Sequence, residues 1–276
     1  LESADYKSTG KNDRFDVQNI SYDAYGNILS LDRYQEVAGA GKRIDRLVYS
    51  YAEGNQLSKV TDNGDANSIT DPDPKINLIK DLGFRDGNTA GDDYGYDING
   101  NMVSDANKGI VSIAYNHLNL PEEVTFADGN YVEYLYDAAG IKLQKKSKVD
   151  TGTPETTDYV AGKHYKDGVL EFFQLSEGRV VKNGNQYDME FHLTDHLGNV
   201  RVTVDEDGNS IQRDDYYPFG LAFNHWNSTI PENQYTYNGK EAQQEWGVLD
   251  YGARMYQADL GRFFTNDRFS EKYYDF

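Results

Sequence analysis

Two histidines four residues apart could bind a metal ion if their backbone were helical. They lie in the segment His192-Leu193-Thr194-Asp195-His196, which superficially resembles the two-histidine zinc motif. The segment lacks the glutamate that serves as the base in that motif. The residues around it favour a strand, in which positions four apart lie ~13 Å from each other. We therefore expect a polar corner between a strand and a turn rather than a metal site.

Calcium is the second ion that the residue types suggest. Asp97-Ile98-Asn99-Gly100-Asn101, followed by Asp105, offers alternating oxygen ligands. A calcium loop has glycine at its sixth position and ends in glutamate, whereas the sixth position here is Met102, so a hairpin turn is the better interpretation. A separate acidic cluster consists of Asp62, Asp65, Asp71 and Asp73. Such clusters are more often solvated loops, so weak calcium binding is the one cofactor interaction left open, and no other cofactor is expected.

No catalytic motif stands out in the chain. A nucleophile elbow, a phosphate loop and a dinucleotide fingerprint are all missing. The chain has no cysteine, which excludes disulfides and thiolate metal sites. Its net charge of −19 disfavours nucleic-acid binding, which needs a positive face. No stretch approaches the ~20 apolar residues of a membrane span.

The most informative feature is a short phrase that returns along the chain: Tyr-Asp, two residues, Gly, one residue and then often an apolar residue. Its three full copies provide the predicted structural residues Tyr22, Asp23, Gly26, Tyr96, Asp97, Gly100, Tyr136, Asp137 and Gly140. Looser copies begin at Tyr51 and Val204. Repetition at short period indicates an architecture that stacks one small unit. Such units usually form walls, scaffolds or binding surfaces.

The residue types in the repeat predict a hairpin. Tyr-Asp should end one strand, Gly should make the turn, and the residue two positions after Gly should begin the return strand. The aspartate can accept hydrogen bonds from the backbone of its own turn, and glycine can adopt positive φ. No ligand is required to explain these residues at this spacing.

Strand patterns dominate the rest of the chain, with Asp-Gly and Asn-Gly turns between them. Hairpins are expected around Asp128-Gly129 and Asp207-Gly208, so the predicted fold is all-β and antiparallel. Loop insertions are expected near 63–92 and 148–158. Helical pattern is weak, and its best cases are short segments near 75–82 and 239–246.

The C-terminal part of the chain contains more specific phrases in a fixed order. They are Leu193-Thr194-Asp195-His196-Leu197-Gly198-Asn199-Val200-Arg201, Tyr216-Tyr217-Pro218-Phe219-Gly220, Tyr237-Asn238-Gly239-Lys240-Glu241, Leu249-Asp250-Tyr251-Gly252-Ala253-Arg254-Met255-Tyr256 and Leu260-Gly261-Arg262-Phe263. In this order they closely resemble the RHS repeat-associated core domain in the form common in Bacteroidetes, and the upstream copies resemble YD repeats. The core residues taken from this resemblance are Asp195, His196, Gly198, Asn199, Arg201, Tyr251, Arg254, Tyr256, Gly261, Arg262 and Phe263.

The resemblance implies a spiralling sheet of hairpins that closes into a hollow shell, with residues 1–190 as the YD-repeat array and 191–276 as the core segment. We expect residues 193–263 to fold inward and plug one end, because their Tyr, Phe and Trp side chains supply apolar surface. It also implies a large secreted or surface-delivered bacterial protein that often holds a C-terminal toxin. In many members an aspartic autoprotease at the end of the core releases this cargo. Asn266-Asp267-Arg268 stands where the first Asp-Pro of that region usually lies. The catalytic aspartates are therefore expected beyond residue 276, and both ends of the chain resemble cuts through a longer polypeptide.

These observations favour a non-enzymatic shell segment over two alternatives. The first alternative is an adhesin-like array that binds glycans or a partner protein through its Tyr-rich face. The second is an enzyme that retains autoproteolysis within this segment. The expected partners are the rest of its own polypeptide, including a C-terminal cargo, and a secretion machinery or chaperone. Neither nucleic acid nor a membrane span is expected, and the expected location is outside the cell or on a bacterial surface.

Overall fold

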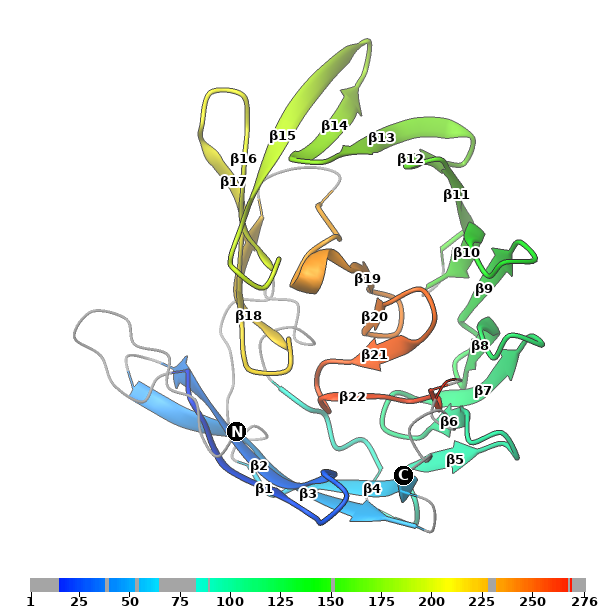
Figure 1. Cartoon of the computed structure of the whole chain (residues 1–276), viewed down its shortest axis with the longest axis vertical. Helices are drawn as coiled ribbons and strands as arrows, with labels where there is room; N and C mark the ends of the chain where they lie inside the picture. The colour runs from blue at the N-terminus through cyan, green and yellow to red at the C-terminus, as the bar shows by residue number, and fades with distance from the viewer. Residues whose placement is uncertain are drawn as a thin grey trace. The chain divides into compact units, whose positions relative to one another are not determined.

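The protein is built almost entirely from antiparallel β-strands (Figure 1). The computed structural model describes residues 15–37, 40–52, 55–64, 83–88, 90–149, 152–227, 232–267 and 269. Within these residues there is no α-helix, and a 3-10 turn covers Tyr237–Gly239. The predicted all-β fold is confirmed. Among the described residues, no helix has the length and apolar character needed to cross a membrane.

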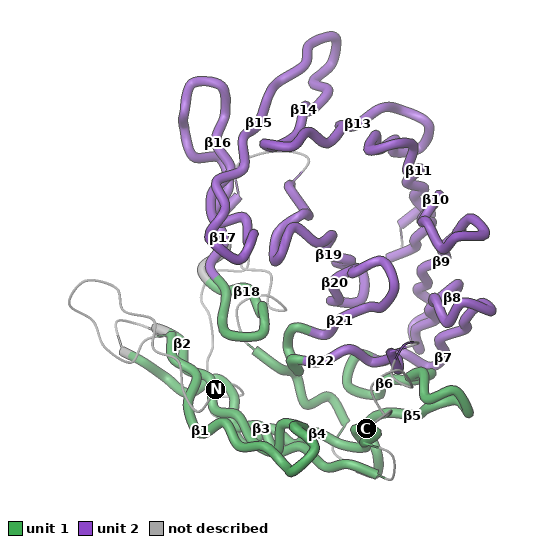
Figure 2. Tube along the Cα trace, in the orientation of Figure 1, with its two compact units in different colours: residues 1–108, 216–223, 258–261 green, residues 109–215, 224–257, 262–276 purple. Residues whose placement is uncertain are grey.

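The chain forms two compact units, coloured separately in Figure 2. Unit 1 comprises residues 1–108, 216–223 and 258–261, and unit 2 comprises residues 109–215, 224–257 and 262–276. Both units therefore combine repeat strands with returning C-terminal segments. The predicted division of the sequence near residue 190 stays a prediction.

Unit 1 contains a four-stranded antiparallel sheet and a hairpin. The sheet has the order β1 (Val17–Tyr22), β2 (Ile28–Val37), β3 (Ala40–Tyr51) and β4 (Leu57–Asp62), and the hairpin joins β5 (Tyr94–Tyr96) to β6 (Met102–Asp105). Leu31, Ile44 and Leu47 are almost fully buried on one face of the sheet. This burial of branched aliphatic side chains is the main source of the sheet's stability.

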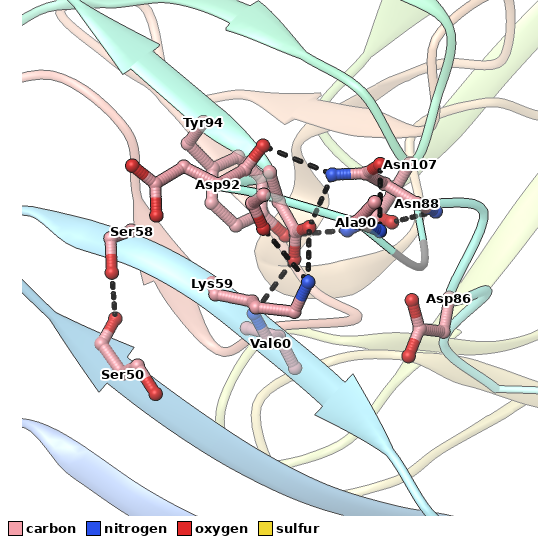
Figure 3. A network of polar contacts seen from close by, with 12 residues as sticks. Ser50, Ser58, Lys59, Val60, Asp86, Asn88, Ala90, Asp92, Tyr94 and Asn107 are labelled. Carbon is pink, nitrogen blue, oxygen red and sulfur yellow. Dashed lines mark hydrogen bonds and ion pairs between the residues drawn. The ribbon is translucent and has the colours of Figure 1, made fainter.

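A buried carboxylate fastens the segment before β5 to β4. Asp93 is 2% exposed; its Oδ2 accepts a hydrogen bond from the backbone N–H of Val60 (2.8 Å) and its Oδ1 accepts one from Asn88 Nδ2 (3.0 Å). Figure 3 shows Val60 on its strand and Asn88, with Asn107 beside it. The Asn88 backbone N–H in turn donates to Asn107 Oδ1 at 2.8 Å. The chain is thus held where it leaves the predicted 63–92 insertion.

Unit 2 is a long series of strands in which each pairs antiparallel with the next. The strands are β7 (Ile110–Tyr115), β8 (Pro121–Phe126), β9 (Tyr131–Tyr136), β10 (Lys142–Lys148), β11 (Glu155–Val160), β12 (Lys163–Lys166), β13 (Val169–Leu175), β14 (Gly178–Asn183), β15 (Gln186–Thr194), β16 (Val200–Val204) and β17 (Ser210–Tyr216). β18 (Ala222–Asn227) has residues in both units. The hairpins expected around Asp128-Gly129 and Asp207-Gly208 are β8–β9 and β16–β17.

The core segment of unit 2 folds back against this series. It forms a small sheet of β19 (Glu241–Gln243), β20 (Val248–Asp250), β21 (Met255–Gln257) and β22 (Arg262–Phe263). Figure 2 shows the longer series curving around β19–β21 within this unit.

Neither of the two weak helical patterns corresponds to an α-helix among the described residues. The segment at 239–246 is not helical, because residues 241–243 pair with β20 and Tyr235 makes a bridge to Glu241. These pairings override a weak helical propensity. The helix expected near 75–82 lies outside the described residues. The loop expected near 148–158 is shorter than predicted, because β10 ends at Lys148 and β11 already begins at Glu155, so residues 155–158 pair with β10 as a strand.

Candidate functional site

The repeat phrases form one recurring turn. In the copy at Asp23, the backbone N–H of Asp23 donates to the Asn27 carbonyl (3.0 Å), and the N–H of Gly26 donates to the Asp23 carbonyl (3.2 Å). The copies at Asp97 and Asp137 have the same pair of bonds, at 2.9–3.0 Å. β1, β5 and β9 each end on the tyrosine, and β2, β6 and β10 each begin two residues after the glycine.

The aspartate side chain satisfies the amides inside this turn. Asp23 Oδ1 accepts from the backbone N–H groups of Tyr25 (2.8 Å) and Asn27 (2.9 Å), while Oδ2 accepts from Asn27 Nδ2 (2.7 Å). The hydrogen bond from the Asn27 side chain is the main reason that the pKa of Asp23 lies below its ordinary value. The carboxylate is therefore occupied by its own loop, which is the role of aspartate in an Asx turn.

The glycines of the three full copies have positive φ: 84° at Gly26, 78° at Gly100 and 84° at Gly140. Residues with a Cβ rarely adopt this left-handed region. A Cβ on Gly26 would meet no atom within 4 Å, whereas one on Gly140 would lie 3.0 Å from Leu120 Cδ1. At Gly26 the requirement is thus purely conformational.

The repeat tyrosines connect neighbouring copies in unit 1, a role that sequence reasoning missed. Tyr51 Oη donates to the carbonyl of Ile28 (2.8 Å), and Tyr96 Oη donates to the carbonyl of Leu57 (2.9 Å). Ile28 and Leu57 each begin the return strand of the preceding copy. The hydroxyl of one copy therefore fixes the start of the strand before it, which explains tyrosine rather than phenylalanine here.

Sequence reasoning also missed a degenerate copy at Tyr115-Asn116. Asn116 Oδ1 accepts from the backbone N–H groups of Leu118 (2.8 Å) and Leu120 (3.1 Å), and Asn119 takes the glycine position with a φ of 57°. Asparagine can replace both residues because its amide oxygen accepts like a carboxylate and it tolerates the left-handed region. The feature of the sequence that could have revealed this copy is the spacing Tyr-Asn-x-x-Asn.

The core phrase at Asp195 is the same turn again. Asp195 Oδ1 accepts from the backbone N–H groups of Leu197 (2.9 Å) and Asn199 (3.1 Å), and Gly198 has a φ of 81°. Burial raises the pKa of Asp195, but hydrogen bonds from Asn199 and the turn lower it by more, so it lies below its ordinary value. His196 is an exposed turn residue and His192 belongs to β15. No cluster of metal-binding side chains occurs among the described residues; Asp65, Asp71 and Asp73 lie outside them.

The ordered core phrases of unit 2 bind one another. Asn199 Oδ1 accepts from the backbone N–H of Asn238 (2.8 Å), and Asn238 Oδ1 accepts from the hydroxyl of Tyr251 (2.7 Å). The ring of Tyr251 packs edge-to-face on Tyr256 (5.6 Å) and on Phe263 (5.4 Å). Four of the five core phrases thus converge on one polar and aromatic cluster.

The remaining named core residues have structural partners as well. Arg201 forms an ion pair with Asp215. Arg254 lies over the ring of Phe263 (4.0 Å) and pairs with Asp267 (3.0 Å). Arg262 belongs to β22.

In unit 1, the Leu260-Gly261 phrase docks on the β1–β4 sheet. Leu260 is 1% exposed, and its carbonyl accepts from the Tyr49 hydroxyl (3.2 Å). Arg33, paired with buried Asp45, donates to the carbonyl of Asp259 at 2.6 Å. Gly261 has a φ of 74°, and a Cβ there would lie 3.1 Å from the ring of Phe219. A buried arginine thus recognises the backbone of a returning segment.

The chain is similar in sequence to a curated protein over part of its length. No family model matches the chain. Salivary gland surface protein 1 of Aedes aegypti is 30% identical over 182 residues, which is 63% of this chain and 5% of that protein. The chain therefore spans a small part of the curated relative that it matches.

Solved structures cover nearly the whole chain. A structure of the Photorhabdus luminescens Tc holotoxin pore with a mutant TccC3 matches 95% of this chain and 14% of that chain, with a TM-score of 0.59 and 15% identity. A crystal structure named TcdB2-TccC3-TEV matches 95% of this chain and 18% of that chain, with a TM-score of 0.53 and 13% identity. The fold is RHS-like and all-β. At this level of identity the likeness concerns the fold alone.

Proposed function

We propose that this chain is a non-enzymatic wall segment of a larger, secreted or surface-delivered bacterial RHS-type protein, with the core segment of the Bacteroidetes type. The main support is that each strand from β7 to β17 pairs with the next one in the sequence, without interruption. Core phrases fold back against this series of strands. Such a series can lengthen by adding hairpins, as a wall requires. The likeness to Tc toxin structures supports the same role.

In this proposal the wall encloses a C-terminal toxin or effector. Its partners are the rest of its own polypeptide and, during delivery, a secretion machinery or chaperone. The repeat carboxylates already bind their own turns, so no cofactor is needed, and any calcium binding would be weak.

Limited proteolysis of the longer protein tests the enclosure. A segment following residue 276 should resist protease while the wall is folded and become sensitive after mild denaturation. An exposed peptide tag fused before residue 1 serves as a control that the protease is active. Rapid digestion of the downstream segment in the native protein would contradict a container.

One surface favours the alternative of a binding array. Tyr187, Met189, Phe191 and Leu193 alternate along one face of β15 and are 36–55% exposed. Contiguous exposed apolar side chains often mark interaction sites, and a surface protein of Aedes aegypti is among the relatives. Binding of the intact protein to a glycan array, abolished by Met189→Asp and Phe191→Asp, would favour this function.

A further inference from the structure

A buried lysine in unit 2 lies between two carboxylates. Lys142, the first residue of β10, has its Nζ 2.6 Å from Glu241 Oε2 and 2.6 Å from Asp250 Oδ2. The three side chains are only 10–11% exposed. Glu241 and Asp250 stand directly opposite each other on β19 and β20.

One oxygen of each carboxylate pairs with Lys142 Nζ, and the other accepts a hydrogen bond from a different group of the protein. Asp250 Oδ1 accepts from the backbone N–H of Gly252 (2.7 Å), and Glu241 Oε1 accepts from the Tyr159 hydroxyl (2.8 Å). The rings of Tyr159 and Tyr134 lie 4.6 Å and 5.8 Å from Lys142 Nζ. The site is thus preorganised and partly shielded from water by aromatic rings.

A simple ion pair needs only one of these carboxylates. Burial lowers the pKa of Lys142, and the two carboxylates raise it by more, so the ammonium is the resting form. Proton transfer from Nζ to a carboxylate gives a neutral amine and a neutral acid, a minor form whose free-energy cost is lower in a low-dielectric site than in water. Lys142 Nζ lies 2.6 Å from Asp250 Oδ2, which is bonded to Cγ. The amine nitrogen is therefore close to the range of about 3–3.5 Å from which it could attack Cγ.

We propose that Lys142 and Asp250 form an intramolecular isopeptide bond, with Glu241 as the proton carrier. The Lys142 amine attacks Cγ of protonated Asp250 and forms the Nζ–Cγ bond. Glu241 takes a proton from the nitrogen and gives it to the departing hydroxyl, so that the Cγ–O bond breaks and one water leaves. The ammonium and carboxylate are converted into an amide and water, with no other reagent and no net change in protons.

The surroundings assign different roles to the two acids. The N–H of Gly252 is placed to stabilise negative charge on Asp250 Oδ1 in the tetrahedral intermediate, as an oxyanion donor does. Glu241 instead contacts the Tyr159 hydroxyl, which fixes its orientation toward Nζ. The product would tie β10 to β20 covalently, in a chain that has no cysteine with which to make a disulfide.

Mass spectrometry of the denatured protein tests this bond. The intact mass should be lower than the sequence mass by one water, and a digest should contain a branched peptide joining the segments around Lys142 and Asp250. Lys142→Arg keeps the positive charge and should restore the full mass. Glu241→Gln should retain the fold, as judged by circular dichroism, yet lose the branched peptide.

The chain supplies a matched control. Lys145 is as buried as Lys142 and pairs with Glu245 at 2.8 Å, its one ion pair among the described residues. Lys145→Arg should leave the branched peptide unchanged. A folded wild-type protein with its full sequence mass after prolonged incubation would overturn the proposal. A water loss that persists in Lys142→Arg without a branched peptide would also overturn it, since Asp-Gly sequences lose water by succinimide formation.

Discussion

At the residue scale, the repeat is a turn that satisfies its own polar groups. One aspartate accepts the amide hydrogens that the reversal of the chain would leave unpaired, and one glycine supplies the left-handed conformation. The copy at Asn116 and Asn119 shows that the requirement is for an acceptor and a tolerant backbone rather than for particular residues. The tyrosine adds the contact between copies.

Gly26 should be limited by backbone conformation alone. Gly26→Val should destabilise unit 1 by about 1–3 kcal/mol because a β-branched residue is strained at a φ of 84°. Gly26→Asn should cost clearly less, since asparagine already fills the equivalent position at Asn119. Chemical unfolding of both variants measures the difference; equal losses would contradict the conformational explanation.

The tyrosine hydroxyls should contribute a measurable part of the stability. Tyr96→Phe removes the hydrogen bond to Leu57 and leaves its carbonyl without that donor, so the free energy of unfolding should fall by about 1 kcal/mol. Tyr136→Phe is the matched control, because the Tyr136 hydroxyl is buried and has no hydrogen-bond partner among the described residues. Its removal should be neutral or slightly stabilising. A larger loss in Tyr136→Phe than in Tyr96→Phe would refute this role.

At the element scale, local patterns predicted hairpins well and contacts between distant segments poorly. The strand at 131–136 and the turns at Gly26, Gly100 and Gly140 follow from residues adjacent in sequence. The weak helical pattern at 239–246 does not become a helix, because residues 241–243 pair with β20. The Asp259 carbonyl that Arg33 contacts and the carboxylates that pair with Lys142 lie more than 90 residues away from those side chains, so no local pattern could identify these contacts.

The docking of the core segment on β12 should depend on pH. His164 stacks on Phe172 (4.1 Å) and its Nε2 hydrogen-bonds with the Tyr235 hydroxyl (3.1 Å). Burial lowers the pKa of His164 from 6.5 to about 4. Between these values the unfolded chain binds a proton that the folded chain does not. The stability of unit 2 should therefore be fully present above pH 6.5 and fall as the pH drops toward 4.

Hydrogen exchange of unit 2 amides between pH 7 and pH 5, corrected for the intrinsic rates, measures this loss. The variant His164→Gln cannot titrate and should show a shallower dependence on pH than the wild type. The comparison cancels the contributions of the other titrating groups, which both proteins share. Identical slopes would show that His164 does not carry the effect.

At the scale of the whole molecule, the repeats and the returning C-terminal phrases contribute differently to the structure. The repeats extend the sheet with local turns. The returning phrases pack against the strands within each unit, where they accept hydrogen bonds from the strand tyrosines Tyr49 and Tyr134. In unit 2 they also form buried ion pairs with Lys142. Stability therefore combines neighbour-to-neighbour contacts, as in other repeat proteins, with long-range ties that a simple array lacks. The phrases that resemble the RHS core are explained by packing, hydrogen bonds and turns.

A structural role for these phrases predicts that the chain does not cut itself. Asp267, the acidic residue nearest the region where the resemblance places autoproteolysis, pairs with Arg254 at 3.0 Å, and Arg254 is held over Phe263. This ion pair gives Asp267 a structural role in holding Arg254 in place. Purified protein should therefore run as one band of unchanged length on a denaturing gel after days at neutral and mildly acidic pH. Cleavage in the wild type that is abolished by Asp267→Asn, but not by the surface control Asp188→Asn, would establish an enzyme instead of a wall.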